Sequence, residues 1–279
     1  MRTDRQHRAT SADGTEIVGA VRGSGPPLVL VHGAVADGES EWGAVVPFLQ
    51  EAFTCHLMST RNRGASGPSD DLAPQRLVED VTAYVDSVGE PLGLAGVSGG
   101  GMWALGAAAR SASVSAVAVH EPVVFEAIDE DLRAGLEAVV AAMEGAAAAG
   151  DHAEAARLFL DGIATDEEVA AMATKPGYYA AAGQYVGVDV AEIRQAAAAE
   201  GFSATDAASL ARITAPVLLT YGGATPMPWF QAGVQHVAAH VADSRLLELP
   251  DAGHLVTAGR PAQIADALVA FFEAAPTPA

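Results

Sequence analysis

The segment Gly96-Val97-Ser98-Gly99-Gly100 places a serine among glycines, at the end of a run of apolar residues. The stretch 91–97 predicts a buried strand, and the apolar stretch 101–109 predicts a helix. A serine at such a strand-to-helix turn lies in strained backbone, and small neighbours allow the turn to close. The first N–H groups of the helix favour a negative charge that develops beside the serine. We therefore interpret Ser98 as a candidate nucleophile; the alternative is an ordinary glycine-rich turn.

His254 is the candidate base. It follows the last predicted strand, in the segment Pro250-Asp251-Ala252-Gly253-His254. A base for Ser98 must reach the serine hydroxyl, so it should lie on a loop at the carboxyl edge of the same sheet. Other histidines lack this context and show no metal-ligand spacing, and we interpret them as structural: His7, His56, His152, His236 and His240.

The segment His32-Gly33-Ala34 ends the first buried strand. A glycine there lets the loop fold back, so that the backbone N–H of Ala34 faces the serine. The N–H of Gly99 would be the second donor, and together they would form an oxyanion hole. The alternative is an ordinary turn after a strand.

The elements that must position these residues alternate between strands and helices, after an opening hairpin at 8–23. Strands are predicted at 27–31, 53–59, 91–97, 114–119, 216–221 and 245–249, and helices at 41–52, 74–88, 101–109, 228–240 and 261–272. This alternation predicts an α/β fold with a doubly wound, mostly parallel sheet. The alanine-rich stretch 125–210 has helical periodicity and no strand. We expect a helical cap there, inserted into a core formed by 1–124 and 211–279.

The amino-acid composition excludes several classes of function. The 279 residues carry 15 basic and 35 acidic side chains, a net charge of −20, and half of the residues are hydrophobic. Such a chain can bury a core, whereas its acidic surface repels nucleic acids and anionic membranes. The single cysteine, Cys55, excludes a disulfide framework, and no apolar run approaches the length of a membrane helix. We expect a cytoplasmic protein without a signal peptide.

The chain resembles the α/β-hydrolase fold family from about Thr10 to Phe272. The resemblance lies in the order of the motifs along the chain: His32-Gly33, the glycine-rich motif around Ser98, the helical stretch 125–210, and the segment that ends in His254. The resemblance implies an eight-stranded sheet and a Ser–acid–His triad that needs no metal or organic cofactor. Members include esterases, lipases, lactonases, thioesterases, carbon–carbon hydrolases, hydroxynitrile lyases and cofactor-free haloperoxidases, and the fold alone does not choose among them. Dehalogenases and epoxide hydrolases of this fold attack with an aspartate, so Ser98 excludes both classes.

One position departs from the family's pattern. The triad acid of most relatives follows the strand after the cap, in a segment like G-x-x-D-x-x-x-P. Here that segment is Tyr221-Gly222-Gly223-Ala224-Thr225-Pro226, with Thr225 in the place of the aspartate. A threonine hydroxyl can hydrogen-bond an imidazole but cannot balance the charge of an imidazolium. Either the triad is broken or the acid has moved.

Glu121 is the candidate for a displaced acid, since the strand after the nucleophile helix ends in His120-Glu121-Pro122. Some relatives, including certain haloalkane dehalogenases, carry their acid at the end of that strand. Neighbouring parallel strands lie about 4.8 Å apart, and the extra methylene of glutamate can cover such an offset. Alternatively, Glu121 faces water or the cap. Asp251 ranks lower, because a residue of the His254 loop seldom has suitable geometry.

The substrate pocket is expected beneath the cap, with His32, Trp103, Phe125, Tyr178 and Tyr179 in its lining. The arginines of the loop 61–67 resemble a D-R-R-G-x-G-x-S segment of relatives. They could contact an acidic substrate, although such a loop is more often held by its own hydrogen bonds.

We expect a serine hydrolase that cleaves a carboxylic ester, lactone or thioester of a small, largely apolar substrate through an acyl-enzyme. Three alternatives stay open: a carbon–carbon hydrolase, lyase or cyclase that uses the same Ser98 and His254, a cofactor-free perhydrolase or haloperoxidase, and a non-catalytic small-molecule receptor, which Thr225 favours. A small-molecule substrate is the expected partner, with no nucleic acid or membrane. Both a monomer and a homodimer are compatible with the sequence.

Overall fold

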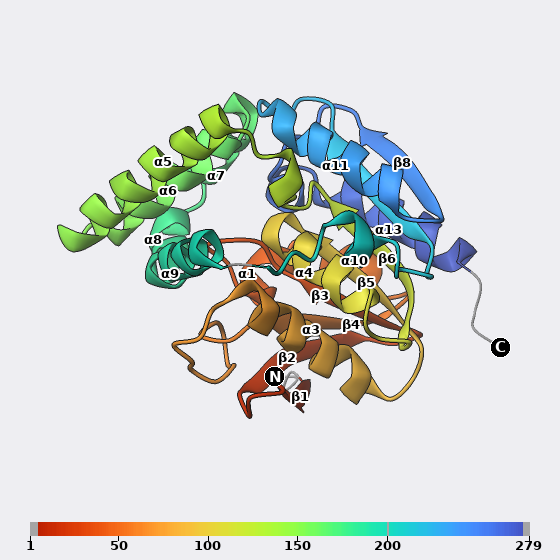
Figure 1. Cartoon of the computed structure of the whole chain (residues 1–279). Helices are drawn as coiled ribbons and strands as arrows, with labels where there is room; N and C mark the ends of the chain where they lie inside the picture. The colour runs from red at the N-terminus through yellow and green to blue at the C-terminus, as the bar shows by residue number, and fades with distance from the viewer. Residues whose placement is uncertain (1–4, 200, 276–279) are drawn as a thin grey trace.

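Eight strands form one sheet in the computed structural model, which describes residues 5–199 and 201–275. The strands lie in the order β1-β2-β4-β3-β5-β6-β7-β8 (Figure 1). Strands β1 and β2 are antiparallel to their neighbours, and the other neighbouring pairs are parallel. Their bounds are β1 (Arg5–Thr10), β2 (Glu16–Gly23), β3 (Pro27–Val31), β4 (Thr54–Ser59), β5 (Leu92–Val97), β6 (Val114–His120), β7 (Val217–Gly222) and β8 (Ser244–Leu249). The predicted fold class is confirmed, including the opening hairpin.

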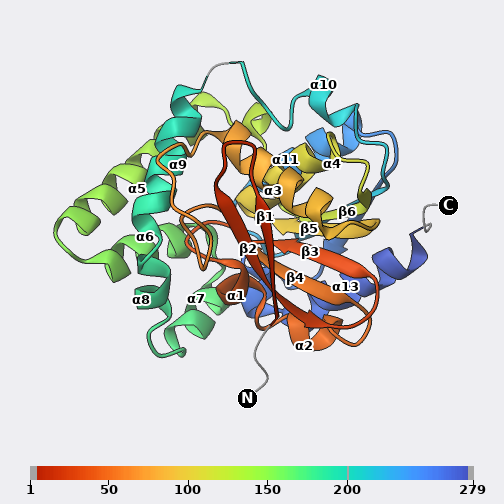
Figure 2. The same cartoon turned by 90° about the horizontal axis from the view of Figure 1, so that it is seen from below.

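Helices cover both faces of the sheet, and this explains why β3 is apolar at every position. All five of its residues are buried, as expected for a parallel strand between two helical layers. One layer contains α3 (Pro74–Val88), α4 (Ser98–Ala108), α10 (Ala207–Leu210) and α11 (Pro228–His240). The other contains α1 (Gly38–Trp42), α2 (Val46–Leu49), α12 (Val256–Gly259) and α13 (Pro261–Ala274). Figure 2 shows α3, α4 and α11 on one side of the sheet, and α2 and α13 on the other.

The single helix predicted at 41–52 is wrong, because two short helices occupy this region. The first begins earlier than expected, since the Asp37 side chain accepts a hydrogen bond from the Ser40 N–H and caps it at 2.8 Å. It ends at Gly43. The second begins with Val46 and Pro47, and proline has no N–H with which to continue a preceding helix.

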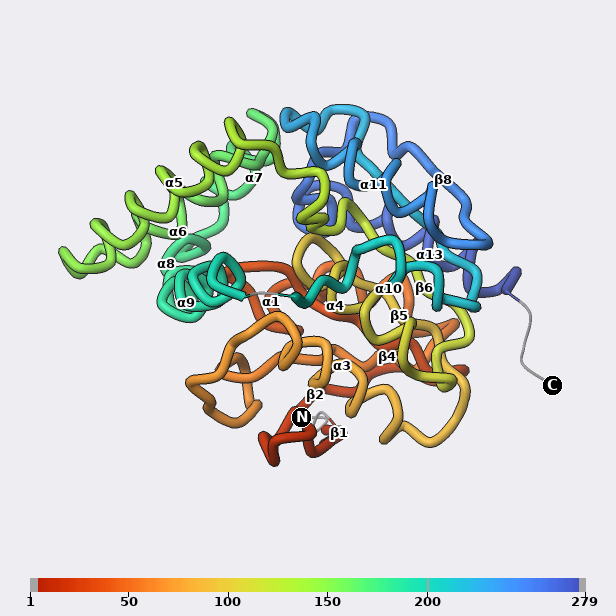
Figure 3. The backbone as a smooth tube through the Cα atoms, in the orientation of Figure 1, coloured from red at the N-terminus to blue at the C-terminus, as the bar shows by residue number. Residues whose placement is uncertain are grey.

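Between β6 and β7 the chain forms a short 3-10 turn, η1 (Phe125–Ala127), and then five helices. We call these five helices, residues 130–198, the helical insert: α5 (Glu130–Ala148), α6 (His152–Ile163), α7 (Asp166–Ala173), α8 (Tyr178–Gly183) and α9 (Val186–Ala198). Figures 1 and 3 show them at one side of the sheet, with α5 and α6 as a protruding hairpin. Some residues of the predicted core (1–4 and 276–279) and of the predicted cap (200) lie outside the described residues.

The register of the parallel strands places the loops that follow β5, β6 and β7 side by side. Val97 pairs with His120, and His120 pairs with Thr220. The residues that follow, Ser98 and Glu121, therefore emerge next to each other at the carboxyl edge of the sheet. Within the described ranges, no helix combines the length and apolar character needed to cross a membrane.

Candidate active site

Ser98 begins α4 directly after Val97, the last residue of β5. Its φ is +54°, in the left-handed region that non-glycine residues rarely adopt. Two glycines make this turn possible. A Cβ at Gly100 would lie 2.2 Å from the carbonyl oxygen of His32, and a Cβ at Gly96 would lie 2.5 Å from that of Gly100. The strained strand-to-helix turn expected from the motif is present.

Glu121 and His254 meet at the carboxyl edge of the sheet. His254 Nδ1 lies 2.7 Å from Glu121 Oε2, and both side chains are buried. Since a carboxylate accepts hydrogen bonds, Nδ1 carries the proton and Nε2 is left as the acceptor. Glu121 has a φ of +42°, and its N–H donates to the carbonyl of Thr220 at 3.0 Å. Asp251, the lower-ranked candidate, is exposed.

The second oxygen of Glu121 explains the unusual Thr225. Oε1 accepts the Thr225 hydroxyl at 2.6 Å and the Gly222 N–H at 2.9 Å. Burial opposes ionisation of this carboxyl, but the hydrogen bond from His254 and the nearby imidazoles outweigh it and lower the pKa of Glu121 to about 2. Thr225 thus donates to the glutamate, at the position where the pattern of relatives would place an acid.

Aromatic stacking and a hydrogen bond to the preceding residue support His254. The Phe230 ring stacks on the imidazole at 3.8 Å between centroids, and Trp229 stacks on Phe230 at 3.9 Å. His120 Nε2 donates to the carbonyl of Gly253 at 3.2 Å, and burial lowers the pKa of His120 to about 4, so its ring stays neutral. These contacts restrict the orientation of the His254 ring, and the hydrogen bond to Glu121 determines its tautomer.

Ala34 and Gly99 line the same cavity as Ser98 and His254. Among the described residues, the backbone N–H of Ala34 has no hydrogen-bond partner. A free N–H at this place can stabilise an oxyanion. The N–H of Gly99 belongs to the first turn of α4, where helix donors are available to a ligand.

The cavity lies between the carboxyl edge of the sheet and the helical insert and has a volume of about 430 Å³. Trp103 and Phe125, two of the predicted pocket residues, line it. Most of its further side chains are apolar: Leu72, Leu77, Met102, Val123, Ile128, Leu136, Val139, Val140, Phe159, Ile163, Ile193, Phe202, Trp229 and Phe230. The lining also contains four charged residues: Arg133, Glu137, Asp189 and Glu192. Such a site accommodates a largely apolar small molecule.

Three predicted pocket residues are not part of this lining. His32 is fully buried: its Nε2 accepts the Thr60 N–H at 3.1 Å, and its Nδ1 donates to the Gly33 carbonyl at 2.7 Å. Burial lowers its pKa to about 3, so the ring is a neutral support of the loop. Tyr178 and Tyr179 pack against each other within the helical insert, where the Tyr179 hydroxyl donates to Asp161 at 2.6 Å.

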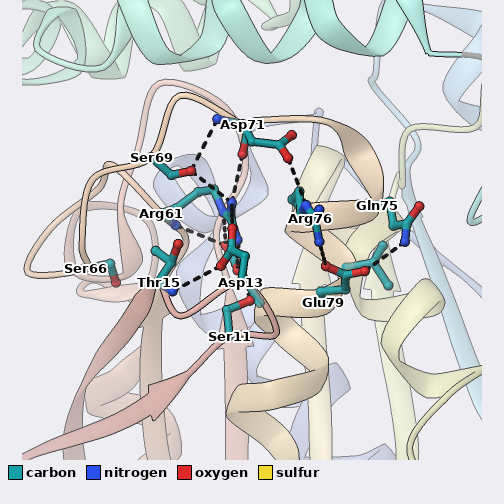
Figure 4. A network of polar contacts seen from close by, with 12 residues as sticks. Ser11, Asp13, Thr15, Arg61, Ser66, Ser69, Asp71, Gln75, Arg76 and Glu79 are labelled. Atoms are coloured by element: carbon teal, nitrogen blue, oxygen red, sulfur yellow. Dashed lines mark hydrogen bonds and ion pairs between the residues drawn. The ribbon is translucent and has the colours of Figure 1, made fainter.

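The arginines of the loop 61–67 hold the protein's own carboxylates. Arg61 is buried and binds Asp80 at 2.6 Å and Asp13 at 2.8 Å; Figure 4 shows its contacts with Asp13, Ser69 and Asp71. Arg63 is also buried and binds Asp189 at 2.7 Å. This favours the structural interpretation of the loop over contact with an acidic substrate.

Comparison with known proteins agrees with the fold. A model of the alpha/beta hydrolase family matches residues 28–267. An alpha/beta hydrolase from Sphaerobacter thermophilus is 28% identical, with a TM-score of 0.73 over 95% of this chain and 100% of the other. An esterase from Rhodococcus is 19% identical (TM-score 0.70, 97% and 99% covered) and a carboxylesterase from Bacillus subtilis is 18% identical (TM-score 0.74, 96% and 91% covered). A search of curated protein sequences finds no match.

The family match spans most of the chain, and the sheet order and its carboxyl-edge loops agree with it. This chain belongs to the alpha/beta hydrolase family. The two esterases have sequences too distant to support more than the shared fold.

Proposed function

We propose that this protein is a serine hydrolase that cleaves an ester-like bond of a small, largely apolar substrate through an acyl-enzyme. The hydrogen bond of 2.7 Å between Glu121 and His254, at the cavity that Ser98 also lines, is the observation that carries the proposal. Glu121 supplies the carboxylate that a threonine at position 225 cannot supply. The similarity of the fold to two esterases is consistent with this choice.

In the proposed mechanism, Nε2 of His254 takes the proton of the Ser98 hydroxyl as its oxygen attacks the carbonyl carbon. Glu121 stabilises the imidazolium that results, and its lowered pKa keeps it ionised at neutral pH. The N–H groups of Ala34 and Gly99 bind the oxyanion. His254 then protonates the leaving alcohol or thiol, and water activated by the same imidazole releases the acid and regenerates Ser98. No metal or organic cofactor enters these steps.

The helical insert acts in this proposal as a cap that closes the apolar cavity over the carboxyl edge. The insert contributes Leu136, Val140, Phe159 and Ile193 to the lining, and residues outside the insert contribute Trp103 and Phe125. Excluding water strengthens the electrostatic interactions around a developing charge. An apolar acyl or alkoxy group fits such walls better than a charged one.

The test is incubation of the protein with a small fluorophosphonate, followed by intact-mass measurement, with Ser98→Ala as control. We expect one adduct on the wild type and none on the variant, because only an activated serine reacts. Hydrolysis of short 4-nitrophenyl esters should then depend on Ser98 as well. A wild type without adduct would count against an activated serine and favour a receptor. An adduct without ester hydrolysis would exclude the esterase assignment and leave other serine chemistry.

A further inference from the structure

Two carboxylates bind the loop 33–37 on either side of Ala34. The N–H of Gly33 donates to Glu41 Oε2 at 3.0 Å, and the N–H of Val35 donates to Asp189 Oδ2 at 3.0 Å. Glu41 is on α1, close in sequence. Asp189 is on α9 of the helical insert, 154 positions further along the chain. Of these three successive N–H groups, that of Ala34 is left for a ligand.

The helical insert attaches to the next two residues of the same loop as well. Arg63, which is bound to Asp189, also donates to the carbonyl of Ala36 at 3.1 Å. The Tyr185 hydroxyl, just before α9, donates to Asp37 Oδ2 at 2.6 Å. The loop is therefore held at three consecutive residues by side chains that belong to, or pair with, the insert.

The backbone at Val35 needs such support. Its φ is +48°, and a β-branched residue in the left-handed region is strained. Strained residues persist only where surrounding contacts over-determine them, and they concentrate at functional sites. Asp189 is 1% exposed, so its hydrogen bond to Val35 forms away from water, where it is difficult to replace.

We infer that Asp189 is a positioning residue of the active site: it holds the Val35 N–H and so keeps the Ala34 N–H directed at the carbonyl that Ser98 attacks. This inference rests on the proposed function, because an oxyanion donor matters only if Ser98 performs that attack. It makes the helical insert a part of the catalytic apparatus in addition to a cover for the cavity.

Two substitutions separate the geometry of Asp189 from its charge. Asp189→Asn can keep an acceptor oxygen for the Val35 N–H, but it loses the charge and the second acceptor oxygen that face Arg63, which retains Glu192 at 3.0 Å. Asp189→Glu keeps the charge but moves the carboxylate by one methylene. Arg63 thus keeps a carboxylate partner in both variants, which favours folding, and a thermal melt of each checks this.

The measurements are kcat and KM for 4-nitrophenyl butyrate and the rate of fluorophosphonate labelling. We expect Asp189→Glu to lower kcat about 10- to 100-fold with KM changed less than about threefold, since a displaced oxyanion donor affects the transition state most. Asp189→Asn should lower kcat less than about fivefold. Gln195→Ala is the matched control: this α9 side chain binds Leu72 N and Asp70 O, away from the loop 33–37, and its loss should leave kcat within about twofold.

The opposite ranking, with Asp189→Asn more damaging to kcat than Asp189→Glu, would overturn the inference and indicate that turnover depends on the charge that faces Arg63 instead of the hydrogen bond to Val35. The same holds if Gln195→Ala lowers kcat as much as Asp189→Glu. A wild type that shows neither Ser98-dependent labelling nor hydrolysis would overturn the proposed function, and the inference with it. A labelled, active wild type whose Asp189→Glu variant is equally active would overturn the inference alone.

Discussion

The sheet core and the helical insert are stabilised in different ways. In the core, strands such as β3 are apolar and buried at every position, and backbones approach so closely that Gly96 and Gly100 leave no room for a methyl group. In the insert, α5 has 19 residues but buries only Val140 and Met143. The buried residues of its small hydrophobic cluster are largely alanine and methionine, and the core contributes Val35 and the partly buried Leu255.

Several polar contacts attach the insert to the core. Arg63 binds Asp189, Tyr185 binds Asp37, and Gln195 binds the backbone at Leu72. The Glu121–His254 pair, in contrast, is formed entirely by residues of the core. We conclude that core substitutions should decide whether the site functions and whether the chain folds. Substitutions of the insert residues that contact the loop 33–37 or line the cavity should adjust that loop or the cavity.

The largest effect is expected for Glu121→Gln. The amide keeps the size of the side chain but cannot balance an imidazolium, so kcat for 4-nitrophenyl butyrate should fall by about 10³–10⁴. Steady-state kinetics of the purified variant would measure this. Retention of more than a tenth of the wild-type kcat would show that His254 does not depend on this acid.

A methyl group at Gly100 should disrupt the core. Its Cβ would lie 2.2 Å from the His32 carbonyl oxygen and 2.7 Å from that of Val31, and neither backbone atom can move freely. We expect Gly100→Ala to lower the free energy of unfolding by about 3 kcal/mol or more. Urea denaturation followed by circular dichroism would measure it, and an unchanged midpoint would contradict the close packing.

The stability difference between wild type and Glu121→Gln should depend on pH. The pKa of Glu121 is lowered on folding from 4.5 to about 2, so its ionised form stabilises the folded state. That contribution is fully present above pH 4.5 and is lost as the pH falls toward 2. Urea titrations of both proteins at pH 7, 5 and 3.5 should show a difference on the order of 1–3 kcal/mol that shrinks with falling pH. A constant difference would contradict the ionised assignment.

Thr225→Ala should have a much smaller effect than Glu121→Gln. It removes one of three hydrogen bonds to Glu121, while His254 and Gly222 still donate. We expect kcat to fall less than about tenfold, in line with the loss of one hydrogen bond. If the two variants proved equally damaging in the same assay, the displacement of the acid to Glu121 would be wrong.

Gly145→Ala tests the insert with the smallest expected change. Gly145 lies within α5, where a Cβ would meet no atom within 4 Å. Alanine has the higher helix propensity and restricts the unfolded chain, so the variant should be more stable by about 0.5–1 kcal/mol. A thermal melt would detect this, and a destabilised Gly145→Ala would contradict the exposed, loosely packed character of α5.

Much of the core could be predicted from local patterns, because each strand is a short apolar run followed by a helix of suitable periodicity. The region around Pro47 was mispredicted as one helix, since apolar spacing alone does not show that Asp37 caps one helix and Pro47 begins another. In the insert, alanine-rich segments predict helices but not how they pack. Tyr178 and Tyr179 were therefore expected in the cavity although they pack within the insert.

The sequence by itself determined the candidate site residues: Ser98 and Glu121 directly follow β5 and β6, His254 lies in the loop after β8, and parallel register brings these loops to one edge. Only the tertiary structure decided that Thr225 donates to Glu121, that Phe230 stacks on His254, and that Asp189 binds Val35. The reason is physical. Strand-end motifs are local in sequence, whereas these contacts join residues far apart in the chain, and their geometry exists only after the core and the insert have packed together.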